Sequence, residues 1–280
     1  MRPLLPSLLL LSIGMLLSEA AAAQTRCKSP SPECVAVGEW DISVSLGAGG
    51  RTNPIRGNSD IPLIVIPQIS YYGERFFLDS LELGFTLHEN DTHTFNLVAT
   101  PGYDRVFFFS NDLQNLFVRG AGGLVLTGEL IEGSDDVRAV PVPRRHTTYL
   151  VGPEWIFRYG RLIGQLDGLY EATGRHHGHE VRAAVATPII ASKDSLVMSL
   201  GLTFKSAELV RYYYGIEGLY EPGSALNPFL KLGYSRPVSE RVGFNAFVHY
   251  EFLDDSVSDS PLVSSSGVAT VFAGWVFKIL

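Results

Sequence analysis

Charged side chains at alternate positions are the residues of this sequence whose spacing points most directly to a chemical role. In the stretch 149–159, Glu154 and Arg158 lie on the face opposite to Trp155. Because successive side chains of a β-strand point to opposite faces, these charges would share one face of a strand. The charges that this pattern places on a common inward face are Glu154, Arg158, Asp167, Glu171, Arg182 and Lys231, with Asp41, Glu82, Glu129, Glu180, Lys205, His249 and Glu251 as further members. They would either pair across a closed interior or line a selective pore, and we expect a closed or narrow lumen.

A second group is formed by His176, His177 and His179, which lie beside Glu180 in one predicted loop. Imidazoles this close together can bind zinc, copper or nickel. A flexible, exposed loop lacks the rigid surroundings that make such a site selective, and the same residues fit a solvated turn. We therefore predict no metal site and no cofactor.

A third group could suggest a hydrolase. Ser256, Ser258 and Ser260 lie close to Asp254 in a segment that follows His249. Catalysis would require a nucleophile, a base and an orienting acid that converge on one point. No spacing in the sequence sets such a geometry, and loops rich in Ser and Asp are commonly hydrophilic surface. We therefore predict that the protein is not an enzyme.

The N-terminus has the pattern of a secretory signal peptide. Arg2 precedes the apolar run 4–17, and the small residues 20–23 follow it. We predict a signal peptide over 1–23, because the apolar run is too short to span a bilayer as a helix. The formal net charge of −7 argues against nucleic acid as a partner.

The two cysteines lie just after this segment. Cys27 and Cys34 are the only cysteines of the chain. An exported chain meets an oxidising compartment, so we expect a small disulfide loop within a periplasmic segment, 24–38. The alternative is a metal or redox pair, which would lack further thiols and a nearby histidine.

The remaining residues, 39–280, show the two-residue apolar period of β-strands. In the stretch 242–252, for example, Val242, Phe244 and Val248 alternate with polar or small residues. Strands of about ten residues with one apolar face are typical of transmembrane β-barrels. We predict strands at 39–50, 62–72, 76–88, 94–103, 122–131, 149–159, 161–172, 180–191, 195–205, 227–237, 242–252 and 270–279. The fold is therefore predicted to be all-β: a single antiparallel transmembrane barrel of about twelve strands, whose last strand pairs with the first.

An even number of strands would place both termini on one side of the membrane, which we predict to be the periplasm. Short turns would then lie on that side and longer loops outside. The segment 104–120 is the exception, because it is long and would be periplasmic. It could form a helix at the barrel mouth, a further strand or an interfacial segment. Its apolar residues Phe107, Leu113 and Phe117 are candidates for partner contact, or else for an aromatic anchor or plug.

Several local patterns resemble one family. They are the opening strand Trp40-Asp41-Ile42-Ser43-Val44, the motif Tyr213-Tyr214-Gly215-Ile216 before Pro222-Gly223, and the motif Asp259-Ser260-Pro261-Leu262-Val263 before the last strand. With the signal peptide and the strand count, the chain resembles the MipA/OmpV family of outer-membrane proteins, whose name records the MltA-interacting protein. The resemblance covers nearly the whole mature chain.

This resemblance implies a monomeric barrel in the outer membrane of a Gram-negative cell, in contact with lipid and lipopolysaccharide. It also implies a non-enzymatic scaffold that brings a peptidoglycan-cleaving transglycosylase together with a synthase. Two alternatives remain open: a narrow channel for small solutes, and an outer-membrane hydrolase. Conductance in planar bilayers distinguishes a channel from a scaffold. Activity on lipopolysaccharide, phospholipid or peptide substrates tests for a hydrolase.

Overall fold

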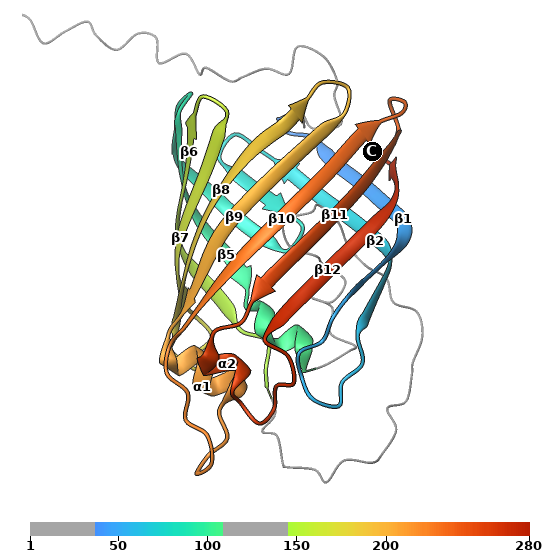
Figure 1. The fold of residues 1–280 in the computed structure, drawn as a ribbon. Coiled ribbons are helices and arrows are strands. Elements are labelled where there is room, and N and C mark those ends of the chain that lie inside the picture. Colours follow the sequence, from blue (N-terminus) through green and yellow to red (C-terminus); the bar gives the residue numbers. More distant parts are fainter. Residues whose placement is uncertain (1–36, 109–144) are drawn as a thin grey trace, which may run out of the picture.

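The structure, a computed structural model, describes residues 37–108 and 145–280. Within these ranges twelve antiparallel strands form a closed barrel, in which each strand pairs with its neighbours in sequence and β1 pairs with β12. The elements are β1 (Trp40–Arg51), β2 (Ile61–Tyr72), β3 (Phe76–Asp79), β4 (Glu82–Glu89), β5 (His93–Pro101), η1 (Tyr103–Phe107), β6 (Tyr149–Tyr159), β7 (Leu162–Glu171), β8 (His179–Ala191), β9 (Ser195–Lys205), α1 (Ala207–Tyr214), β10 (Ala225–Pro237), β11 (Val242–Phe252), α2 (Asp255–Ser258) and β12 (Gly267–Lys278). Figure 1 shows the tilted strands, with both labelled helices at one end of the barrel. The predicted all-β barrel of twelve strands is confirmed.

The outer face of the barrel carries the apolar side of each alternating strand. On β10 and β11, Leu230, Leu232 and Val248 are between 40% and 54% exposed. Their inward neighbours on the next strands, Phe247 and Phe272, are 5% and 3% exposed. This distribution suits a barrel whose outside meets lipid hydrocarbon while its inside holds polar groups and a few packed aromatics.

The barrel closes where β1 meets β12. Their register runs from Ser43 opposite Lys278 to Arg51 opposite Thr270. The prediction that the last strand pairs with the first is therefore confirmed. The two strands approach closely at Gly47, because a Cβ atom at this position would clash with the carbonyl oxygen of Ala273. Glycine thus permits the backbone contact that removes the last open edge.

One predicted strand is in fact two. The stretch expected as a single strand, 76–88, contains β3 and β4, which pair with Asp79 opposite Glu82. The turn between them uses Ser80 with a φ of 56°. Glycine and asparagine are the residues that usually mark such a left-handed turn, and serine rarely adopts this conformation. The sequence therefore carries no turn signal at this position. The strand predicted at 122–131 lies outside the described residues, and β5 pairs directly with β6.

The connections divide into two groups at the two ends of the barrel. The short turns 73–75, 90–92, 160–161, 192–194 and 238–241 lie at one end, which we call the short-turn end. The longer segments 52–60, 172–178, 206–224 and 253–266 lie at the other, the long-loop end, as does η1 after β5. Only the β3–β4 turn departs from this division among the described residues, because β3 is short.

Two segments were predicted at the wrong end. The turn before β5 lies at the short-turn end, since Arg158 N donates to Thr92 O at 2.8 Å beside the β6–β7 turn. The start of the segment 104–120 lies at the long-loop end, where Phe107 O accepts from Asn58 Nδ2 at 2.7 Å. The cause of both errors is the uncounted strand that precedes them, because the division of 76–88 into β3 and β4 reverses the chain direction. With this correction, the segment no longer breaks the pattern of long loops at one end.

The helix α1 forms because its apolar residues recur with helical spacing. Leu209, Val210, Tyr213 and Tyr214 are each at most 1% exposed, so one face of this helix packs into the protein. Among the residues that the structure describes, no helix has the length and apolar character needed to cross a membrane.

The face assignment predicts different outcomes for two substitutions on β11. Val248→Arg puts a charge on the lipid-facing side near the middle of the strand, at a cost of about 2 to 4 kcal/mol. Asn245→Arg puts the same charge toward the lumen, where Asn245 lines a cavity, and should cost clearly less. The folded fraction of each variant, measured by heat-modifiable mobility in gels, checks this. Equal loss of folded barrel would contradict the assignment.

Candidate functional site

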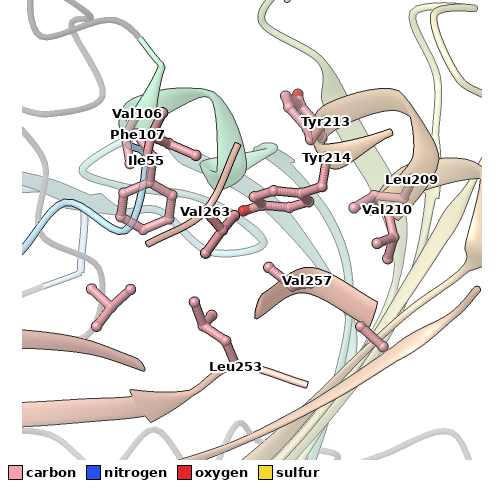
Figure 2. Close-up of a cluster of buried hydrophobic side chains, with 12 residues drawn as sticks. Ile55, Val106, Phe107, Leu209, Val210, Tyr213, Tyr214, Leu253, Val257 and Val263 are labelled. Atoms are coloured by element: carbon pink, nitrogen blue, oxygen red, sulfur yellow. The ribbon is translucent and has the colours of Figure 1, made fainter. Parts of the chain in front are cut away.

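The long-loop end of the barrel is filled by a cluster of apolar side chains, which we call the plug cluster. Its members are at most 9% exposed and are Ile55, Val106, Phe107, Leu209, Val210, Tyr213, Tyr214, Ala225, Leu253, Val257, Val263 and Val268. Figure 2 shows that these side chains converge from η1, α1, α2 and the loops between strands. Because the segments come from different sides of the barrel, their packing closes this end of the lumen.

A buried ion pair joins η1 to the end of β9 beside the plug cluster. Lys205 Nζ at the end of β9 lies 2.6 Å from Asp104 Oδ1 in η1, and the two side chains are 9% and 3% exposed. Tyr214 OH donates to the same carboxylate oxygen at 2.7 Å. Burial, together with the charge of Asp104, raises the pKa of Tyr214 well above its usual value, so this hydroxyl keeps its proton. The prediction did not single out Asp104, whose one signal was its position just after a strand.

The last turn of α1 is held by side chains from other loops. Arg145 donates to Tyr213 O at 3.2 Å and to Gly215 O at 3.1 Å. Ser260 Oγ donates to Tyr214 O at 2.7 Å. The last carbonyl groups of a helix have no partner within the helix, so these donors satisfy them in a buried setting. The plug is therefore tied together by polar bonds as well as by apolar packing.

The histidine loop is organised by Glu171. The carboxylate of Glu171 accepts hydrogen bonds from the backbone N–H groups of Thr173, Arg175, His176 and His177. Glu171 thus bonds to its own loop, and does not pair across the lumen as we expected. The local backbone donors were nearer than any charge on the opposite wall.

Two of these histidines, His176 and His179, contact different aromatic side chains. Nδ1 of His176 accepts from Gly178 N at 3.0 Å, and its ring centroid lies 5.3 Å from that of Tyr212. His179 stacks near Phe204 at 5.9 Å. Within the described ranges no group of three or more His, Cys, Asp or Glu side chains has a geometry that could hold a metal ion.

The other predicted lumen charges lie on the inner wall with varied partners. Glu154 accepts from Asn96 and Gln165, both at 2.8 Å, and Gln165 also donates to Asp167 at 3.0 Å. Arg158 donates to Thr94 Oγ1 at 3.3 Å. Arg182 pairs with Glu180 on its own strand. Lys231 lies 5.9 Å from the ring centroid of Phe247. The contacts of Arg182 and Lys231 therefore run along the wall and not across the lumen.

The lumen is hollow at the short-turn end. A cavity of about 1150 Å³ extends from the turn residues Lys193 and Glu240 to Lys231 on the inner wall. Polar side chains on its strands include Ser45, Gln68 and Ser199, and they alternate with apolar lining residues such as Val197 and Phe244. Paired charges were expected to occupy the lumen, but they leave this half open, and the plug cluster is what closes the other half.

The residues considered for a hydrolase do not assemble. Ser260 is buried and bonded to Tyr214 O, while Asp254 accepts from the N–H groups of Ser256 and Leu226 at the start of α2. Burial alone would raise the pKa of Asp254, but these N–H donors hold it below its usual value. His249 lies in β11, on the lumen wall.

Comparison with known sequences gives a family match over almost all of the barrel. The profile of the family described as MltA-interacting protein MipA matches residues 44–279. "Putative outer membrane protein YiaT" of Escherichia coli K12 is 24% identical over 250 residues, covering 85% of this chain and 91% of that protein. "MltA-interacting protein" of the same strain is 22% identical over 280 residues, covering 96% and 98%.

Comparison with solved structures gives barrels of the same general kind. The NanC porin aligns with a TM-score of 0.40 at 9% identity, covering 86% of this chain and 100% of that one. OmpT of Vibrio cholerae aligns with a TM-score of 0.36 at 8% identity, covering 88% and 98%. At these scores the alignments carry no information about function.

The buried pair predicts a large effect of one charge removal in the plug. Asp104→Asn leaves the ammonium of Lys205 buried without its counter-charge, which should destabilise the protein by about 3 to 5 kcal/mol. The matched control is Asp194→Asn, which breaks the exposed Asp194–Arg236 pair at the short-turn end and should cost about 0 to 1 kcal/mol. Urea unfolding of both variants in detergent checks this. Similar losses in both would show that the Asp104–Lys205 pair is not the stronger interaction.

The histidine loop predicts a pH dependence. Burial lowers the pKa of His176, and the nearby Glu171 only partly opposes this, so the ring is neutral in the folded protein. In the unfolded chain a histidine takes up a proton near pH 6.5, so stability is fully present above about pH 6.5 and falls as the pH drops below it. His176→Asn keeps an acceptor for Gly178 N but does not titrate, and should flatten this slope.

Melting temperatures measured from neutral to mildly acidic pH test this, with His88→Asn at an exposed position as the control. The control should keep the slope of the unsubstituted protein. An unchanged slope in His176→Asn would assign the acid sensitivity to other groups.

Proposed function

This chain belongs to the MltA-interacting protein MipA family and is an outer-membrane β-barrel, and we propose that it acts as a docking protein for enzymes that process peptidoglycan. In this proposal the barrel is monomeric and non-enzymatic, and its outer face meets lipid and lipopolysaccharide. The partners are a peptidoglycan hydrolase and a synthase in the periplasm. One relative carries an interaction with MltA in its name.

The plug cluster is the observation that supports this proposal. A barrel that conducts solutes needs a continuous aqueous path, whereas here η1, α1 and α2 pack across the lumen with buried apolar side chains. The buried pair of Asp104 and Lys205 adds a polar tie between η1 and the end of β9. What such a barrel still offers is a rigid body held in the membrane with two different ends.

The short-turn end is the proposed docking surface. Short turns of outer-membrane barrels face the periplasm and long loops face outside, so this end would lie nearest to the peptidoglycan. Exposed side chains there include Tyr159 at 80% and Val238 at 57%. Phe107, our earlier candidate, is buried in the plug cluster at the other end. Leu113 and Phe117 lie outside the described residues.

A narrow channel is the second candidate, and one observation favours it. The cavity of about 1150 Å³ opens at the short-turn end and could form half of a solute path. Under this reading the plug would have to open for solutes to pass. Conductance therefore separates the two candidates.

The docking proposal predicts where partners attach. A photo-crosslinking residue at Arg161 or Lys193, in the short turns, should capture peptidoglycan-processing enzymes in living cells. The same residue at Leu219, which is 67% exposed at the long-loop end, is the control and should capture none. Mass spectrometry of the crosslinked products provides the measurement. Capture of such enzymes only from Leu219, or from no position in a folded barrel, would refute the proposal.

Planar-bilayer recordings complete this test. The purified barrel should show little current, and the folded Asp104→Asn variant should show more current if the plug is what blocks the path. Large, steady conductance of the unsubstituted protein would favour the channel.

A further inference from the structure

One row of polar side chains crosses five strands of the lumen wall. In the strand register Arg51 lies opposite Thr270, Thr270 opposite His249, His249 opposite Lys231, and Lys231 opposite Ser199. Side chains directly opposite in antiparallel strands lie on the same face of the sheet, about 5 Å apart. Their outward neighbours, such as Val248 and Leu230, are exposed, so the row faces the lumen. The wall therefore presents a band of cationic and hydroxyl groups.

Lys231 has no counter-charge. Other cations pair with carboxylates: Lys205 with Asp104, Arg182 with Glu180, Arg236 with Asp194 and Lys278 with Asp41. No such pair involves Lys231 anywhere in residues 37–108 and 145–280, where its recorded contact is the ring of Phe247. An ammonium group inside a protein without a partner is unfavourable unless something compensates it. An anion bound in the lumen would supply that compensation.

The surroundings of Lys231 can hold hydrogen-bonding ligands. Lys231 lines the cavity of about 1150 Å³ together with Ser45, Ser199 and Asn245. Asn245 Nδ2 donates to Ser45 Oγ at 3.4 Å, while its buried Oδ1 has no partner among the described residues. Hydroxyl and amide groups both donate and accept, so this wall suits a solute that carries several hydroxyl groups.

We propose that the cavity is a binding site for small hydroxylated carboxylates of the sugar-acid type, with Lys231 Nζ bound to the carboxylate. The ligand hydroxyl groups bond to Ser45, Ser199 and Asn245. A single ammonium fits one carboxylate as a point charge, and a charge-assisted hydrogen bond of this kind is stronger than a neutral one. Because the plug cluster closes the far end, the ligand enters and leaves through the short-turn end. This site is independent of the docking role and goes beyond it.

The experiment titrates the detergent-solubilised full-length barrel with gluconate, using sorbitol as the neutral polyol of similar size. Isothermal titration calorimetry and ligand-induced shifts in melting temperature are the readouts. Gluconate should bind with a dissociation constant of about 1 mM or below, sorbitol much more weakly, and added salt should weaken gluconate.

Three variants locate the charge. Lys231→Gln should weaken gluconate binding about tenfold or more, because it removes the group that contacts the carboxylate. Lys193→Gln makes the same charge change in a turn at the cavity mouth and should bind almost normally. Lys231→Arg keeps the charge and should retain most of the binding. In the absence of ligand, Lys231→Gln should not melt below the unsubstituted protein, since it removes an unpaired charge.

The site is refuted if gluconate fails to bind the unsubstituted barrel in this range or if sorbitol binds as tightly. Equal weakening of gluconate binding by Lys193→Gln and Lys231→Gln would also overturn the site, because binding would then depend on the overall positive charge of the cavity and not on Lys231. If Lys231→Gln does not fold, two other results would refute the site. One is loss of gluconate binding in a folded Lys193→Gln variant, and the other is gluconate binding that added salt does not weaken.

Discussion

Inside a lipid bilayer no water is available to a backbone N–H or C=O group, so a sheet that crosses the membrane must pair both of its edges. In this protein the pairing of β1 with β12 meets that requirement along nine residue pairs, from Ser43–Lys278 to Arg51–Thr270. Once the sheet is closed, every strand has a lipid face and a lumen face. The alternation of the sequence, the outward apolar side chains and the polar interior all follow from this closure.

Closure leaves an interior that must be filled or left open, and the two ends of this barrel differ in that respect. At the long-loop end, apolar residues from η1, α1 and α2 pack together, with Asp104 and Lys205 paired beside them. At the short-turn end the turns are too short to reach inward, so a cavity remains. The barrel therefore has one end filled by packed side chains and one end that holds a cavity. Its closed end gives it rigidity, and its open end offers a surface and a pocket.

The inward charges show how burial selects partners. Glu171 accepts hydrogen bonds from four backbone N–H groups of its own loop, and Lys205 pairs with Asp104 of η1. Both arrangements satisfy a buried charge with several donors or with one opposite charge. Lys231 satisfies neither condition within the described residues, which is why it marks the wall on which a ligand is proposed. The rule that a buried charge needs a partner therefore explains the contacts of Glu171 and Lys205 and identifies Lys231 as the group proposed to bind a ligand.

The sequence by itself determined the barrel class, most of the strands and the pairing of the last strand with the first. The alternation in stretches such as 242–252 depends only on the two-residue period of a strand and on the contrast between lipid outside and polar groups inside. It is therefore visible in the sequence alone. The turn at Ser80 was missed, because serine is uncommon in the left-handed conformation and because β3 has only four residues, too few for the shift in its alternation to stand out. That single turn reversed the direction of the following strands and moved the start of the segment 104–120 to the other end. The plug, the Asp104–Lys205 pair and the isolation of Lys231 were decided only by the tertiary structure, because each depends on which residues face one another across the lumen.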